Sequence, residues 1–304
     1  MEKITINLPP KNKLIELNKF SHKNWDFYSH KEFMMPSTEM DLLTTNKNIE
    51  SSHLPEIFFG YNRLYLVNKS LNFSYEFSPL QMIDLSLFSK RKECLNKNLI
   101  LYDPPEVKVL HENHWKNLKM PRDDIIKVEA KSDWTYSSSY MGNFSCINNS
   151  DEIKNLFKNE NFEDKTFKNE INDALNIPIE KLGPNNPIIH YEEINFYEDE
   201  LNDNGICQTK IRFRIMDDCF YGILRSYLRV DNVTIRNMDT RIFHAFGENN
   251  IIRMFTVKDM SYDQLKKIGF SFSSEWNLSL YQSDEVDRFM GQPKFCKIDQ
   301  ILLS

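Results

Sequence analysis

Residues 188–257 read IIHYEEINFYEDELNDNGICQTKIRFRIMDDCFYGILRSYLRVDNVTIRNMDTRIFHAFGENNIIRMFTV, and the architecture of the 304-residue chain follows from them. Apolar residues recur there at every second position. Ile211, Phe213 and Ile215, for example, alternate with Lys or Arg, so one row of side chains is expected on an apolar face and the other in water. Polar turn formers such as Asp231–Asn232 separate these runs. The stretch predicts an antiparallel meander whose apolar face must pack against a second layer of structure.

Further strands and helices are predicted on both sides of this stretch. The blocks at 54–77 and 134–144 have patterns typical of strands. A Ser-Pro pair then favours a helix over 79–90, because serine caps a helix and proline fits its first turn. A second helix is expected over 261–268, whereas no pattern assigns 270–304. These elements predict an α+β fold with an antiparallel, two-layered β-sheet core and a few flanking helices.

Composition excludes several classes of function. The net charge is −6, which argues against nucleic acid as a partner, since such proteins need a basic face. Five scattered cysteines, an odd number, indicate reduced thiols in the cytoplasm or also the nucleus. No segment is long and apolar enough for a membrane span or a secretion signal. Partners in a membrane are therefore not expected.

No cofactor or metal site is predicted. His111 and His114 lie three residues apart, whereas a zincin helix needs four. The acidic cluster at 192–203 suits a solvated strand edge better than a pair of glycosidase carboxylates. One enzyme alternative is a jelly-roll oxygenase, in which two histidines and a carboxylate hold Fe(II) and an arginine binds 2-oxoglutarate. Its residues would be His190, Glu192, His244 and Arg253.

Three blocks resemble a known family. They are LPEIFFG at 54–60, DWTYSSSYMG at 133–142, and the run from YEEINFYEDELNDNG to VTIRNMDTR at 191–241. Their residues and their order are similar to those of the TOR signalling pathway regulator family, the TIPRL or TIP-forty-one-like proteins. Three ordered blocks are a more specific signal than one short motif.

The resemblance implies both an organisation and a function. It implies a single domain over 1–304, with family-specific insertions at about 91–130 and 143–178. Residues 151–175 fit either an amphipathic helix or a disordered insertion. The implied function is non-catalytic: binding and inhibition of catalytic subunits of type 2A-family protein phosphatases, including their C-terminal tail. A phosphatase-associated scaffold protein is a further candidate partner.

Seven arginines between Arg212 and Arg253 allow two interpretations. They pair with acids on neighbouring strands, or some line a cleft for the acidic phosphatase tail, since arginine binds a carboxylate through two parallel hydrogen bonds. At family level that tail carries an aromatic residue and ends in a leucine carboxylate. The candidate cations for the terminal carboxylate are Arg229, Arg236 and Arg241. The candidate residues for an apolar slot are Phe213, Ile215, Tyr227 and Tyr136.

The resemblance also marks single residues as partner-binding. It implies this role for Asp239 and Ile177, and we include Met238 beside Asp239. The residues around Asp239 suit a turn, in which the carboxylate would cap its own backbone. If Asp239 instead meets the partner, Asp239→Asn is expected to weaken binding with little change in thermal stability. Gln81 stands where the resemblance predicts an acid, which argues against a partner contact from the helix at 79–90.

Overall fold

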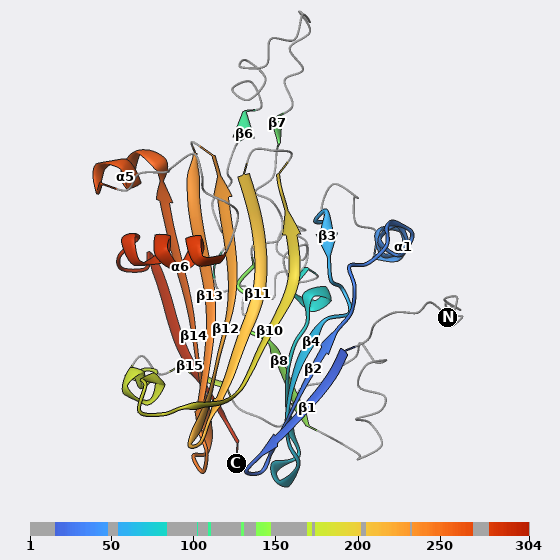
Figure 1. Ribbon diagram of the computed structural model, residues 1–304, viewed down its shortest axis with the longest axis vertical. Helices are drawn as coiled ribbons and strands as arrows, with labels where there is room; N and C mark the ends of the chain where they lie inside the picture. The colour runs from blue at the N-terminus through green and yellow to red at the C-terminus, as the bar shows by residue number, and fades with distance from the viewer. Residues whose placement is uncertain are drawn as a thin grey trace, which may run out of the picture.

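The computed structural model describes two antiparallel sheets packed face to face, with a few short helices around them (Figure 1). The two-layered antiparallel core predicted from the sequence is confirmed, and strands dominate the fold. Within the part of the chain that is described, no helix has the length and apolar character needed to cross a membrane. The described residues are 16–47, 54–83, 102, 109–110, 129–130, 138–146, 169–171, 174–201, 205–231, 233–269 and 280–303.

The larger sheet has eight strands, and the predicted meander forms its centre. Five consecutive strands of twelve residues each pair antiparallel with their sequence neighbours. They are β10 (Ile188–Asp199), β11 (Gly205–Met216), β12 (Cys219–Val230), β13 (Thr234–Ala245) and β14 (Asn250–Ser261). The edges are completed by β3 (Ile57–Phe58) beside β10, and by β15 (Phe295–Leu302) and β9 (Asn169–Ile171) beyond β14.

The smaller sheet has five strands and packs on one face of the larger one. Its order along the sheet is β1 (Glu16–His22), β2 (Trp25–Lys31), β4 (Arg63–Asn68), β5 (Phe73–Phe77) and β8 (Asn143–Cys146). The strand pair expected within 54–77 is confirmed as β4 and β5. The block at 134–144 differs from its prediction, because 138–142 are not in a strand and β8 begins at Asn143. A separate two-stranded ribbon pairs β6 (Val109–Leu110) with β7 (Glu129–Ala130).

The helices are short and lie at the periphery. The helix predicted over 261–268 is confirmed as α5 (Tyr262–Lys267), which begins with a capping box between Ser261 and Gln264. Of the helix predicted over 79–90, residues 79–83 are helical and the remainder lies outside the described residues. Helix α6 (Leu280–Phe289) was not predicted, and α1 (Ser37–Lys47) lies within 34–53, where the sequence shows a brief helical pattern among turn formers.

The predicted insertions are only partly described. Within 143–178, β8 and β9 belong to the two sheets, and within 91–130 the described strands are β6 and β7. That these segments are family-specific insertions stays a prediction. The alternatives of helix and disorder at 151–175 fall mostly outside the described residues.

An aromatic core fills the space between the two sheets. Trp25 and Phe27 of β2 contact Phe220 of β12, with ring centroids 5.2 and 5.7 Å apart. Phe220 also packs on Phe213 of β11 at 5.5 Å. Since apolar side chains on alternate positions of both sheets meet here, the alternation seen in the sequence explains this inner face.

The alternation predicted that the Lys and Arg side chains on the other face of the large sheet lie in water. This prediction is wrong, because several of them are buried. Lys210 is only 8% exposed and contacts Glu193. On the neighbouring strand, Arg225 is 3% exposed. The cause is α6, which lies across this face, together with the segment 174–186 at the lower end (Figure 1). Polar side chains there are therefore buried in pairs.

Phe220→Ala is expected to destabilise the fold by about 3–5 kcal/mol, the usual cost of truncating a buried phenylalanine. Phe220 is fully buried and bridges the two sheets. Leu42→Ala on α1, where the side chain is 42% exposed, is the control and should stay within about 0.5 kcal/mol. Urea unfolding measures both free energies, and equal losses would contradict the packing described here.

Candidate functional site: a charged band on the outer face

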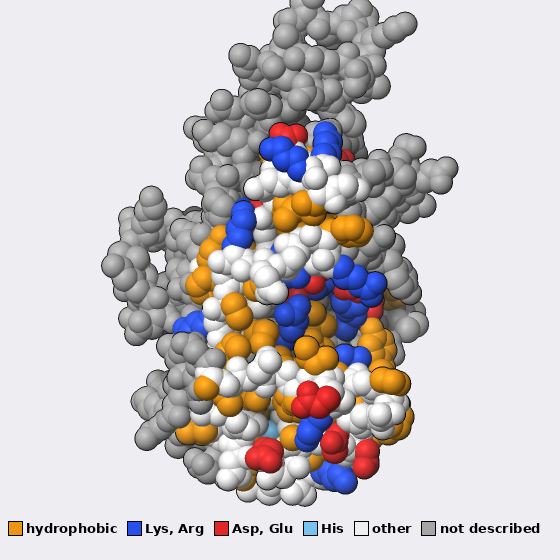
Figure 2. Space-filling model, turned by 90° about the vertical axis from the view of Figure 1, so that its left-hand side faces the viewer, with side chains coloured by type: hydrophobic (Ala, Val, Ile, Leu, Met, Phe, Trp, Pro, Cys, Tyr) orange, Lys and Arg blue, Asp and Glu red, His pale blue; other side chains and the backbone are white. Residues whose placement is uncertain are grey.

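The face of the large sheet turned away from the small sheet, here called the outer face, carries a connected group of charged side chains. Because paired residues of antiparallel strands share a face, the register identifies its members. Arg212, Ile223, Arg241 and Met254 form one such row across four strands. Figure 2 shows that Lys, Arg, Asp and Glu side chains gather across the middle of this face, with hydrophobic side chains above and below them.

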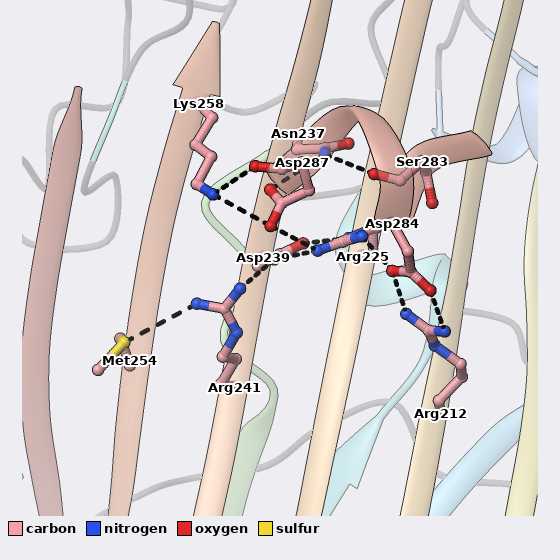
Figure 3. A network of polar contacts seen from close by, with 10 residues as sticks. All are labelled: Arg212, Arg225, Asn237, Asp239, Arg241, Met254, Lys258, Ser283, Asp284 and Asp287. Atoms are coloured by element: carbon pink, nitrogen blue, oxygen red, sulfur yellow. Dashed lines mark hydrogen bonds and ion pairs between the residues drawn. The ribbon is translucent and has the colours of Figure 1, made fainter. Parts of the chain in front are cut away.

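Seven side chains make up what we call the charged band (Figure 3). Four strands and α6 contribute to it, so residues up to 75 positions apart in the sequence are brought together. Its cations and carboxylates alternate in space, each facing groups of opposite sign. The members are Arg212 of β11, Arg225 of β12, Asp239 and Arg241 of β13, Lys258 of β14, and Asp284 and Asp287 of α6.

The centre of the charged band is a buried ion pair between Arg225 and Asp239. The two residues are cross-strand partners, and their side chains are 3% and 2% exposed. Arg225 donates from Nε to Asp239 Oδ1 and from Nη2 to Oδ2, both at 2.7 Å. Burial disfavours the charged form of each group, but their mutual attraction outweighs it. The pKa of Asp239 is therefore lowered and that of Arg225 is raised.

Helix α6 adds the two further carboxylates. Asp284 accepts two hydrogen bonds from Arg212, at 2.7 and 2.8 Å, and also contacts Arg225. Burial opposes ionisation of Asp284, yet its hydrogen bonds to Arg212 and the charge of Arg225 hold its pKa below the ordinary value. Asp287 pairs with Lys258 at 3.0 Å and lies 3.6 Å from Arg225. The helix therefore completes the ionic partners of three strands.

Apolar packing fixes α6 over the band. Val286 of the helix and Met290 directly after it are 0% and 4% exposed. They pack against apolar residues of the sheet and of α5, and Asn237 donates a hydrogen bond to the carbonyl oxygen of Ser283 at 3.2 Å. The sheet and α5 residues of this cluster are Ile206, Tyr227, Ile235, Tyr262 and Leu265.

Arg241 is the accessible cation next to the buried pair. Its side chain is 22% exposed, and one Nη donates to Asp239 Oδ2 at 2.6 Å. The other Nη lies 4.0 Å from the sulfur of Met254. Because Arg225 already holds both oxygens of Asp239, Arg241 can turn towards another anion without leaving that carboxylate unpaired.

Apolar groups surround Arg241 on the same face. Its cross-strand neighbours Ile223 and Met254 are half-buried. Below them lies a cluster that includes Ile177 from the segment 174–186, which is 4% exposed. The arrangement offers a reachable guanidinium beside apolar surface, which suits an anionic segment that also carries an apolar side chain.

The structure brings together only part of the predicted site. Asp239 and Arg241 are in the charged band, and Ile177 is in the apolar cluster beside it. Met238 lies on the inner face in a cluster with Met141, Phe255 and Val257, at 2% exposure. Tyr136 lies outside the described residues.

The predicted turn around Asp239 is wrong. Asp239 sits in the middle of β13, where its carboxylate binds two arginine side chains. The sequence Asn-Met-Asp-Thr contains turn formers, but pairing with strands on both sides overrides that local preference.

The predicted combination of tail-binding residues also needs correction. Phe213 is 1% exposed and Ile215 is fully buried, both in the core between the sheets. They face away from Arg241, because adjacent positions of a strand alternate between faces. Arg236 is fully buried and pairs with Asp259 at 3.0 Å. Of the other candidates, Arg229 pairs with Asp231 at 2.8 Å, and Tyr227 lies beneath α6.

The oxygenase alternative is wrong. His190 contacts Glu192 at 3.3 Å, but His244 lies on the same row three strands away. Three strand spacings amount to about 14 Å, too far for one metal ion. His244 instead packs on Trp25 and hydrogen-bonds the carbonyl oxygen of Asn250 at 2.8 Å. Among the described residues, no cluster of His, Cys, Asp and Glu is suited to a metal ion.

The matching family covers the strands that carry the charged band. The TIP41-like family profile matches residues 57–266, more than half of the chain. The chain belongs to the TIP41-like family. A TIP41-like protein of Dictyostelium discoideum is 29% identical over 266 residues, covering 86% of this chain and 85% of that protein. The type 2A phosphatase activator TIP41 of Saccharomyces cerevisiae is 29% identical over 281 residues, covering 88% and 70%. A human TIP41-like protein is 26% identical over 253 residues, covering 83% and 80%.

Sequence reasoning missed the contribution of α6 to this TIP41-like chain. The signal was present in SDEVD at 283–287, where Asp284 and Asp287 are three residues apart and so share a helical face. Val286 and Met290 are four apart and mark the buried side.

Gln81, where the family resemblance predicts an acid, has partners inside the protein. It donates to Glu76 at 3.3 Å and accepts from the Tyr140 hydroxyl at 2.8 Å.

Asp239→Asn is expected to lower the free energy of unfolding by about 3–5 kcal/mol, because it leaves a buried arginine without its charged partner. This replaces the expectation of unchanged stability, since Asp239 is buried rather than in a surface turn. Asp217→Asn is the matched control: its side chain is 75% exposed and its carboxylate lies 3.9 Å from His22, so the loss should be below about 1 kcal/mol. Thermal and urea unfolding would contradict the account if the two variants lost the same stability.

Stability is expected to fall in acid, partly through Asp239 and Asp284. Both have a lowered pKa in the folded state, so the unfolded chain binds more protons at low pH. Their stabilising contribution is complete well above the unfolded value near 3.9 and is lost as pH falls below that value, through the lower folded values. Urea unfolding over this range should give a shallower pH dependence for Asp239→Asn than for the wild-type chain. Parallel curves would show that Asp239 is not ionised in the fold.

Proposed function

We propose that this chain is a non-catalytic regulator that binds the catalytic subunit of a type 2A-family protein phosphatase and inhibits the isolated subunit. The observation that carries the proposal is the family match over 57–266, which contains the central strands and Ile177. The names of the Saccharomyces cerevisiae and Schizosaccharomyces pombe relatives support the partner, since both read type 2A phosphatase activator.

The outer face is the proposed contact surface. Charged groups on a rigid sheet present a fixed pattern to a partner, and an apolar cluster beside them supplies area that water would otherwise cover. Arg241 is a reachable cation of this face, and Ile223 and Met254 give apolar contacts next to it. Asp239 then acts indirectly, because it orients Arg241.

Arg241→Gln is expected to weaken binding of the purified phosphatase catalytic subunit by about 30-fold or more, if its charge pairs with the partner in a water-poor interface. Calorimetric titration measures the affinity. The control is Lys19→Gln on β1, which removes one positive charge from the small sheet at a side chain that is 47% exposed. An equal loss in both variants, or none in either, would place the contact elsewhere.

The direction of regulation has its own readout. Phosphatase turnover is measured as the chain is added to the isolated catalytic subunit up to and beyond one equivalent. Inhibition that saturates at one equivalent is expected. A rate that rises instead would favour the activation named in the fungal relatives and would contradict inhibition.

The C-terminal tail of the phosphatase is the proposed occupant near Arg241. Its free carboxylate would accept hydrogen bonds from the guanidinium, and its aromatic residue would pack on Ile223 and Met254. A labelled tail peptide should bind better as the free acid than as the methyl ester, which lacks the charge, and Arg241→Gln should remove that difference. Identical binding of acid and ester would overturn the tail proposal. A scaffold protein is a separate proposed partner, and it is not required if the purified catalytic subunit binds alone.

A further inference from the structure

Helix α6 changes the net charge of the charged band, because the strands alone contribute four cations and one carboxylate to it. The sheet contributes four cations to the charged band and the single carboxylate of Asp239. The helix contributes Asp284 and Asp287, so four cations meet three carboxylates. Without the two helix acids, the same seven positions would carry three net positive charges instead of one.

The helix acids occupy particular cations rather than merely lying nearby. Asp284 accepts hydrogen bonds from both Nη atoms of Arg212. Asp287 pairs with Lys258 at 3.0 Å. Arg241, by contrast, has no partner from α6 among the contacts of the charged band (Figure 3).

The position of α6 makes this neutralisation a lasting feature. Val286 and Met290 are buried against the sheet, so the acids are held over the cations by apolar packing. The helix spans Leu280–Phe289, beyond the residues 57–266 that match the family profile. The basic strands and their acidic cover therefore lie in different parts of the chain.

We propose that Asp284 and Asp287 determine the specificity of the outer face. By engaging Arg212, Arg225 and Lys258, they leave Arg241 as the cation of the charged band that has no acid from α6. The charged band then accepts a segment with one anionic group and discriminates against polyanions. The inference deepens the proposed function, because it assumes that an anionic partner segment binds at Arg241.

Polyanions provide the sharpest probe of this role. A polyanion gains affinity for every cation that it can neutralise, because each contact releases condensed counterions. Arg212 and Lys258 lie at opposite sides of the charged band and are 25% and 15% exposed in the presence of α6. Removing the helix charges would make both available to separate phosphates of one strand of nucleic acid.

The test compares Asp284→Asn/Asp287→Asn with the wild-type chain for binding to a single-stranded oligothymidine of about 20 nucleotides. The double variant should bind at least tenfold more tightly. Its affinity should also fall more steeply with salt, by about 1.4 in the logarithmic slope for two added phosphate contacts. The matched control is Asp263→Asn with Glu180→Gln, two exposed acids outside the charged band, which changes the net charge equally. Equal affinities of the double variant and the control would overturn the proposal.

A double-mutant cycle distinguishes unmasking of Arg212 from a loss of folding in the helix variants. Arg212→Gln should leave oligothymidine binding almost unchanged in the wild-type chain, because Asp284 already occupies that arginine. In the Asp284→Asn background the same change should cancel the gain in affinity. If Arg212→Gln has the same effect in both backgrounds, Asp284 does not mask Arg212 and the inference fails.

Failure of this inference is distinguishable from failure of the proposed function. Phosphatase binding by the wild-type chain is measured separately. If the wild-type chain binds the phosphatase while the helix variants behave like the control, the proposed function stands and the role of α6 falls. If the wild-type chain binds no phosphatase, the proposed function falls, whatever the helix variants do.

Discussion

The buried ion pair between Arg225 and Asp239 is the interaction on which the outer face depends. Two charges in the middle of a sheet lose their hydration, so their remaining donors and acceptors must find partners in the protein. Asp284 and Asp287 of α6 satisfy Arg225 from above, and Arg241 satisfies Asp239 from the side. Replacing such a pair by apolar residues can be neutral for stability, whereas removing one partner is costly. The pair therefore serves mainly to specify where α6 docks and how Arg241 is held.

The two faces of the large sheet have different roles: the inner face packs the core and the outer face presents charged side chains. The inner face is an aromatic core in which Phe213 and Phe220 meet the rings of β2, and it fixes the strands in register. The outer face uses the same strands to hold charges at set positions. Because strands packed on both sides are rigid, the backbone positions of side chains such as Arg241 are fixed without help from flexible loops. We infer that partner recognition in this TIP41-like chain uses a preformed surface.

Local periodicity predicted the meander, the second sheet layer and α5, because each of these leaves its mark on neighbouring residues. It could not predict which arginines stay accessible, since Arg236 and Arg241 sit in the same strand and differ only by the face on which they lie. That difference depends on register across β12, β13 and β14. Turn formers around Asp239 misled for a related reason: pairing on both sides of a central strand outweighs a local preference. The family resemblance pointed to Asp239 and Ile177, but a segment 41 residues further along the chain from Asp239 supplies the charges of α6.

The central claim is that the phosphatase binds to the outer face. Hydrogen–deuterium exchange of the chain, alone and with an equivalent of the purified catalytic subunit, tests it most directly. The account predicts that added protection is concentrated in the segment 174–186, in the middle of β12, β13 and β14, and in α6, because these surround Arg241. Protection confined to β1, β2 and α1 on the opposite side, with the outer face unchanged, would contradict the account.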